Sequence, residues 1–178
     1  FINKINNKNI YDLGFNYIPR INNKYKYIDD VLIFIIFIVM LFFNINYINF
    51  IILYIIIRFI RMICMLSITI PPADKNCFKK QKQKQKSFKY VKFITGHCGE
   101  TIFSAHTTIL LLCILFIMPK VNNFFKILLF VYGLIGSILI IALRHHYTID
   151  VILAWVITIL VYISYFGKNN FIKLLPNL

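Results

Sequence analysis

Long apolar runs constrain this chain more than any other feature of its sequence. Residues 147–166 contain a single acid, close to the start of the run, and residues 124–143 contain a single lysine, Lys126. A helix needs about 20 mainly apolar residues to cross a bilayer. Because Lys126 can extend its amine to the near interface, we predict a transmembrane helix in each run.

Three further apolar segments are predicted to cross the membrane. Residues 103–118 form a shorter span, and the stretch 31–70 has the length of two spans, 31–47 and 50–70, separated by asparagines. One long helix over 31–57 is the alternative reading, and we favour the two spans. The predicted fold class is therefore all-α, a polytopic transmembrane helix bundle with about five helices.

The remaining residues are polar and give the chain a simple order. A polar N-terminal segment covers 1–30, the transmembrane domain covers 31–166 and a C-terminal tail covers 167–178. A basic loop at 71–97, with an alternating Lys-Gln tract, interrupts the transmembrane domain. Such a low-complexity tract is typical of a solvated loop, and attraction to anionic lipid headgroups is the alternative.

Composition argues against two other classes of protein. Hydrophobic residues make up 60% of the chain and charged residues 15%, whereas soluble domains average about 45–50% and about 25%. The formal net charge of +14 would be compatible with nucleic-acid binding. Here, however, the positive charge lies between apolar runs too long for soluble helices. We therefore expect a membrane protein with no nucleic-acid partner.

Ionisable residues near the spans are the first functional candidates, because charged groups are costly in a bilayer. His106 lies just inside the start of the span 103–118, and His146 and Asp150 lie at the start of the span 147–166. Two membrane crossings separate these two starts. The three side chains are therefore predicted to lie on the same face of the membrane.

The spacing of His146 and Asp150 suggests a chemical role. Residues four apart lie on one face of a helix, with Cβ atoms about 5–6 Å apart. A carboxylate at that position can hold the imidazole in one tautomer and raise its basicity, as in catalytic triads. His106, from a different helix, could then donate a proton to a leaving group.

Cationic and polar neighbours would complete a phosphate site. Arg61 or Arg144 could neutralise a phosphate by bidentate hydrogen bonds. Ser104 and the backbone N–H groups at the start of the 103–118 helix would bind the anion. The set predicts histidine-based phosphoryl transfer at a membrane surface, without a cofactor.

Two alternatives and one minor assignment accompany this reading. Two histidines and a carboxylate, His106, His146 and Asp150, would also suit iron or zinc, although we expect no metal. Asp150 alone could complement the helix dipole. We interpret His145 as an interfacial histidine.

Four motifs give the chain a recognisable pattern. The stretch CGETIFSAHTT (98–108) resembles the Cys-Gly-Asp…Ser-Gly-His-Thr motif of sphingomyelin synthases, which are related to lipid phosphate phosphatases. HYTIDVILAW (146–155) is similar to that family's His-Tyr-Thr/Ser-x-Asp-Val-x-x-Ala-Tyr motif. RMICMLSITIPPADKNC (61–77) is similar to the family's helix that starts at an arginine and ends in Thr-x-x-Pro followed by a cysteine. YDLGFNYIPRI (11–21) faintly resembles the segment before the family's second helix.

The resemblance implies a six-helix transmembrane fold. The sequence of this chain would then begin after the first of the six helices. It also implies an enzyme of the Golgi or plasma membrane that moves a phospho-headgroup from phosphatidylcholine or phosphatidylethanolamine to ceramide. That double displacement uses no metal. His146 attacks the phosphorus of the headgroup, and Asp150 orients the His146 ring. His106 protonates the departing diacylglycerol and then deprotonates the ceramide hydroxyl.

Departures from the pattern leave related readings open. Ala105 stands where the family has glycine, Glu100 where it has aspartate and Trp155 where it has tyrosine. The alternatives are an inositol-phosphorylceramide synthase, a lipid phosphate phosphatase or a truncated inactive copy, and a homo-oligomer is also open. The positive-inside rule would place the catalytic face in the cytosol, whereas the resemblance implies the lumen or the exterior, and we follow the resemblance.

Overall fold

The computed structural model describes residues 11–25, 27–67, 73, 103–168 and 171. Within them the chain forms helices and no strands, which confirms the all-α fold class. The α-helices are α2 (Leu13–Tyr17), α3 (Ile28–Leu41), α4 (Tyr47–Ser67), α6 (Ala105–Ile117), α7 (Asn123–Ala142) and α8 (Thr148–Phe166), with 3-10 turns η1 (Asn23–Tyr25) and η3 (Met118–Lys120). Most of the predicted basic loop 71–97 and of the tail 167–178 lies outside the described residues, as do residues 98–102.

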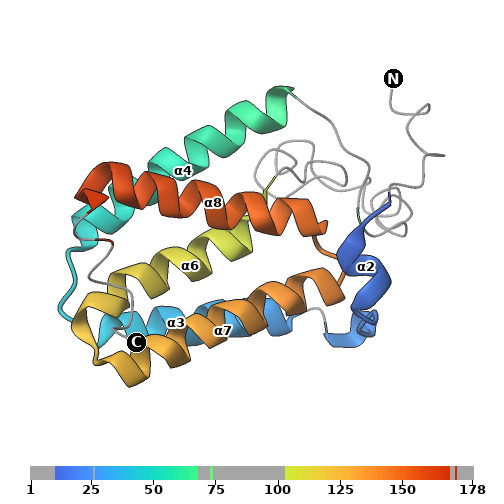
Figure 1. Cartoon of the computed structure of the whole chain (residues 1–178), viewed down its shortest axis with the longest axis horizontal. Helices are drawn as coiled ribbons and strands as arrows, with labels where there is room; N and C mark the ends of the chain where they lie inside the picture. Colours follow the sequence, from blue (N-terminus) through green and yellow to red (C-terminus); the bar gives the residue numbers. More distant parts are fainter. Residues whose placement is uncertain (1–10, 26, 68–72, 74–102, 169–170, 172–178) are drawn as a thin grey trace, which may run out of the picture.

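The five longer helices run alternately up and down and form one bundle (Figure 1). α6 lies in the middle and packs against α3, α4, α7 and α8. Because the direction alternates, the starts of α3, α6 and α8 lie at the same end as the last turns of α4 and α7. The short helix α2 lies across this end, against α7 and α8 (Figure 1). Every candidate residue from the sequence therefore belongs to one end of the bundle.

The stretch 31–70 forms two helices, so the alternative of one helix over 31–57 is wrong. α3 ends at Leu41, and α4 begins at Tyr47. Asn46 stabilises the new start, because its side-chain oxygen accepts a hydrogen bond from the N–H of Asn49 at 3.1 Å. Asparagine at this position favours a helix start over a continuous helix.

The central helix α6 is buried on all sides. Every residue from Leu110 to Ile117 is buried, as expected for a helix that is apolar all round. α7 approaches it closely at Gly136, where a Cβ atom would lie 2.5 Å from Leu110 Cδ2. α8 is tied to α7 by a hydrogen bond of 2.9 Å from Trp155 Nε1 to Ser137 Oγ. The bundle thus has a solid core along α6.

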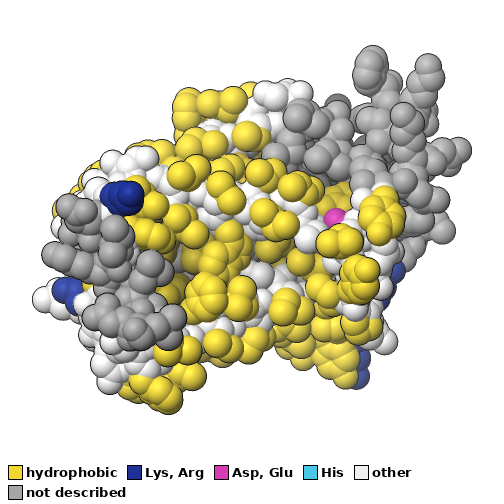
Figure 2. Space-filling view, viewed as in Figure 1, with side chains coloured by type: hydrophobic (Ala, Val, Ile, Leu, Met, Phe, Trp, Pro, Cys, Tyr) yellow, Lys and Arg dark blue, Asp and Glu magenta, His cyan; other side chains and the backbone are white. Residues whose placement is uncertain are grey.

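The outer surface of the bundle is strongly apolar (Figure 2). α4, α7 and α8 are long and apolar enough to cross a membrane, and α6 with its 3-10 extension is a shorter apolar helix. Large hydrophobic side chains are exposed on the four outer helices, among them Phe34, Phe59, Ile138 and Leu160. A continuous apolar surface of this kind is suited to lipid rather than to water. The molecule is a membrane protein.

Candidate active site

The starts of α6 and α8 are joined directly. The N–H of Ser104 donates to the carbonyl oxygen of Asp150 at 3.1 Å. Ser104 Oγ accepts from the N–H of Thr107 at 3.2 Å and so caps α6. Just before this cap, the buried Phe103 has φ of 32°, a conformation that costs a non-glycine residue about 1–3 kcal/mol. The surrounding packing therefore imposes the turn into α6.

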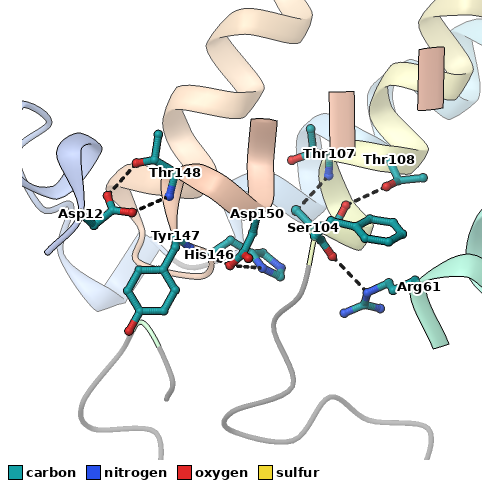
Figure 3. Close-up of polar contacts among 10 residues, drawn as sticks. Asp12, Arg61, Ser104, Thr107, Thr108, His146, Tyr147, Thr148 and Asp150 are labelled. Carbon is teal, nitrogen blue, oxygen red and sulfur yellow. Dashed lines mark hydrogen bonds and ion pairs between the residues drawn. The ribbon is translucent and has the colours of Figure 1, made fainter. Parts of the chain in front are cut away.

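His146 and Asp150 face each other at the start of α8 (Figure 3). His146 Nδ1 lies 3.7 Å from Asp150 Oδ2, and the two residues are 6% and 1% exposed. The same oxygen accepts the N–H of Tyr147 at 3.0 Å. A separation of 3.7 Å is an ion-pair distance, longer than a hydrogen bond. The carboxylate thus faces Nδ1, and the other ring nitrogen, Nε2, is the one suited to chemistry.

His146 lies in the turn between α7 and α8, outside both membrane helices. Burial lowers the pKa of His146 below its ordinary value, and Asp150 opposes this shift without reversing it. Electrostatic interactions with Arg61 and His106 lower the pKa of His146 further. The imidazole is therefore neutral at pH 7, with a lone pair available for attack on an electrophile.

Two more histidines at this end each contact an acid from the first turn of α3. His106 Nε2 lies 3.2 Å from Asp30 Oδ1, and His145 Nδ1 lies 2.7 Å from Asp29 Oδ2. The two rings are close, with centroids 6.3 Å apart. The structure therefore adds Asp29, Asp30 and His145 to the neighbourhood of the predicted proton donor, His106.

The two candidate arginines point in different directions. Arg61, on the last part of α4, donates from Nε to the carbonyl oxygen of Phe103 at 3.1 Å, so it lies beside the start of α6 (Figure 3). Arg144 donates from Nη2 to the carbonyl oxygens of Phe15 and Ile18, both at 3.0 Å. Its guanidinium also stacks 4.0 Å from the centre of the Phe15 ring. The structure thus brings Arg61 to the site and directs Arg144 into α2.

The segment around α2 forms hydrogen bonds with the first residue of α8, Thr148 (Figure 3). Asp12 accepts the N–H of Thr148 at 2.8 Å through Oδ2 and the hydroxyl of Thr148 at 2.6 Å through Oδ1. The N–H of Gly14 donates to the same hydroxyl oxygen at 3.0 Å. A Cβ atom on Gly14 would overlap Thr148 Oγ1, so this close approach requires glycine.

Buried polar atoms without a partner gather at this end of the molecule. Within the described residues, seven buried side-chain N or O atoms have none, and six of them lie at this end of the bundle: those of Asp29, His106, Thr107, Arg144, His146 and Asp150. Buried polar atoms are normally hydrogen-bonded, so their concentration at this end is compatible with a polar site. Across the same residues, no group of three or more His, Cys, Asp or Glu side chains is placed to hold a metal ion.

The helix starts that carry His106, His146 and Asp150 fall within one matched segment. Residues 97–167 match the PAP2 superfamily C-terminal family. The resemblance inferred from the motifs is confirmed over this segment. No solved structure matches the chain significantly.

Three relatives extend the comparison. The chain is 37% identical over 76 residues to the human sphingomyelin synthase-related protein 1. This match covers 41% of this chain and 18% of the human protein. The mouse protein of the same name gives 37% over 76 residues, covering 41% and 16%. The chain is 41% identical over 59 residues to the Arabidopsis thaliana phosphatidylinositol:ceramide inositolphosphotransferase 3, and the match covers 33% of this chain and 20% of that protein. The matches thus span a fifth or less of the length of these relatives.

Sequence reasoning missed the acids that come from outside the matched segment. The prediction assigns Asp12, Asp29 and Asp30 to the polar N-terminal segment and interprets His145 as an interfacial residue. A signal was present, because the chain has only six acids and two of them stand side by side at the start of an apolar run. The cost of charge near lipid applies to Asp29 and Asp30 as it does to Asp150.

Proposed function

We propose that this protein transfers a phospho-headgroup, phosphocholine or phosphoethanolamine, from a glycerophospholipid to ceramide through a phosphohistidine. The products are sphingomyelin or its analogue and diacylglycerol. The observation that carries the proposal is the buried, neutral His146 beside Asp150, with His106 on the neighbouring helix start. The similarity to sphingomyelin synthase-related protein 1 supports the choice of lipid.

The first displacement breaks the bond between phosphorus and the diacylglycerol oxygen. His146 attacks phosphorus through Nε2, while Asp150 holds Nδ1 and stabilises the positive charge that develops on the ring. His106 gives its proton to the departing oxygen, which leaves as diacylglycerol. Arg61 lies where its charge would balance the phosphate oxygens, beside the carbonyl of Phe103.

The second displacement reverses the roles of acid and base. The primary hydroxyl of ceramide gives its proton to His106, and its oxygen attacks the phosphorus of the phosphohistidine. The bond between phosphorus and His146 Nε2 breaks, which returns a neutral imidazole. His106 is protonated again, so one cycle needs no external proton donor.

A second candidate shares this chemistry and differs in the headgroup. The similarity to a phosphatidylinositol:ceramide inositolphosphotransferase favours inositol phosphate as the transferred group. A phosphatase with water as the acceptor would use the same three side chains, His106, His146 and Asp150. The identity of the new lipid separates these reactions, because each leaves a different product.

The test is a transfer assay in membranes that contain the protein. A labelled ceramide analogue is supplied with phosphatidylcholine, phosphatidylethanolamine or phosphatidylinositol in turn, and the labelled products are separated. We expect a labelled phosphosphingolipid with one of the first two donors, and none with His146→Ala at equal protein abundance. Product from phosphatidylinositol alone would favour the second candidate, and release of the free phospho-headgroup (phosphocholine, phosphoethanolamine or inositol phosphate) without labelled lipid would favour a hydrolase with water as the acceptor.

Loss of the nucleophile should be nearly complete. Removing such a residue typically costs several powers of ten in turnover. Wild-type turnover by His146→Ala would therefore overturn the assigned nucleophile. A wild-type protein that makes no product from any donor, and releases no free phospho-headgroup, would instead favour an inactive copy.

A further inference from the structure

The first turn of α3 carries two adjacent acids that contact two histidines from different elements. Asp29 reaches His145 in the turn between α7 and α8, and Asp30 reaches His106 in the first turn of α6. Consecutive helix residues point about 100° apart, so neighbouring acids can serve partners on two elements. This helix lies outside the segment that matches the family.

The Asp29 contact is the tighter of the two. Asp29 is 2% exposed, and its Oδ2 lies 2.7 Å from His145 Nδ1. A buried carboxylate is costly unless it is paired and hydrogen-bonded, so the arrangement holds the His145 ring strongly. The pair of Asp30 and His106 is partly exposed and is more open to a substrate.

His145 stands next to the proposed nucleophile in the chain, so its position affects that of His146. The N–H of His145 donates to the carbonyl oxygen of Ile140 at 3.2 Å, and Arg144 before it has φ of 59°. A turn that includes a strained residue persists only when its surroundings over-determine it. The Asp29 contact is one of those constraints, because it fastens the turn to α3.

We propose that Asp29 and His145 form a positioning pair for His146, and that Asp30 is the positioning residue for His106. This inference rests on the proposed function, in which His146 attacks phosphorus and His106 carries the proton. Asp29 and His145 touch no reacting atom, and Asp30 acts only through its contact with His106 Nε2. They set where the two reacting imidazoles lie relative to each other.

The Asp29–His145 pair and the Asp30–His106 pair predict different effects of the leaving group on the reaction rate. From a nitrophenyl ester of the transferred headgroup, nitrophenolate leaves without a proton, whereas diacylglycerol needs one. In a single turnover without ceramide, Asp30→Asn should therefore slow the release of diacylglycerol roughly 10–100-fold and the release of nitrophenolate much less. Asp29→Asn should reduce kcat with both donors by a similar factor, because it displaces the nucleophile.

A double-mutant cycle tests whether Asp29 acts through His145. Asp29→Asn and His145→Asn should each lower kcat with little change in KM, and the double variant should be no worse than the worse single variant. Asp29→Glu, which keeps the charge, should recover part of the activity. Val31→Ala, in the same helical turn and exposed, is the control and should keep wild-type kcat.

A second measurement does not depend on turnover. Diethyl pyrocarbonate modifies accessible imidazoles, and the rate at His145 is followed by mass spectrometry in membranes. Asp29→Asn should raise that rate, while Val31→Ala should leave it unchanged. An unchanged rate together with wild-type kcat in Asp29→Asn would overturn the inference and leave the proposed function standing. A raised rate in a protein whose wild type has no turnover would retain the contact but overturn both the proposed function and the positioning role.

Discussion

At the scale of single residues, the protonation of His146 links structure to rate. Burial, the largest influence, lowers its pKa below the ordinary value of about 6.5. Attack needs the neutral ring, so activity is present above the pKa and is lost as pH falls through it. We expect the acidic limb of the kcat/KM profile to lie below pH 6.5, measured over pH 4.5–8, a range set around the reference value for histidine.

The same profile in Asp150→Asn tests the role of the carboxylate. Asp150 raises the pKa of His146, so its loss should move the acidic limb to lower pH. The maximum rate should fall by roughly three to four powers of ten, because the ring loses the group that fixes its tautomer. A limb that moves to higher pH would show that Asp150 does not stabilise the protonated ring.

The sequence could predict local pairs of residues but not distant ones. The four-residue spacing of His146 and Asp150 places both on one helix face, and the observed Nδ1–Oδ2 separation of 3.7 Å agrees with that geometry. The contact of His145 with Asp29 joins residues 116 positions apart, and it depends on how α3 packs. Arg144 has φ of 59° and its side chain points into α2, which proximity in sequence to the histidines could not reveal.

At the scale of elements, α2 holds the start of α8 in place. A Cβ atom on Gly14 would overlap Thr148 Oγ1 and lie 2.9 Å from Ile141 Cγ2. Gly14→Ala should therefore displace α2 and lower the free energy of unfolding by about 1–3 kcal/mol. It should also lower kcat, since Thr148 follows His146 by two residues. Thermal unfolding in detergent and the transfer assay measure the two effects.

Asn16→Ala is the matched control for that variant, because Asn16 lies on the exposed side of the same short helix. It should leave both the unfolding temperature and kcat near wild type. Equal loss in the two variants would mean that α2 tolerates no change at all, and that the close approach at Gly14 has no special importance.

Element boundaries were predictable where capping chemistry accompanies an apolar run. The runs 124–143 and 147–166 became α7 and α8 almost unchanged. The break in 31–70 was placed near its asparagines, and Asn46 does cap the following helix. α3 begins at Ile28, three residues before the predicted start at 31, because the prediction assigned Asp29 and Asp30 to the polar N-terminal segment. Their contacts with histidines permit the helix to begin earlier.

At the scale of the whole molecule, composition predicted a lipid environment but not the arrangement of the helices. The apolar helices resemble one another in sequence, so nothing in a run of Leu and Ile distinguishes the central helix α6 from those that face lipid. Small residues give the clue, since close helix approach in membranes favours glycine. Gly133 and Gly136, on the side of α7 that meets α6 and α8, mark the packed face.

The packing of α7 against α6 can be tested by enlarging the side chain at position 136 and reducing the one at position 110. Gly136→Leu places a large side chain where even a Cβ atom would lie 2.5 Å from Leu110 Cδ2. It should lower the free energy of unfolding by about 1–3 kcal/mol, and lower kcat because α6 carries His106. Leu110→Ala in the same protein should restore part of both. Ile138→Phe, on the exposed side of α7, is the control and should behave as wild type. A harmless Gly136→Leu would mean that α6 does not lie between α7 and the other helices, and the site would lose the support that holds His106 near His146.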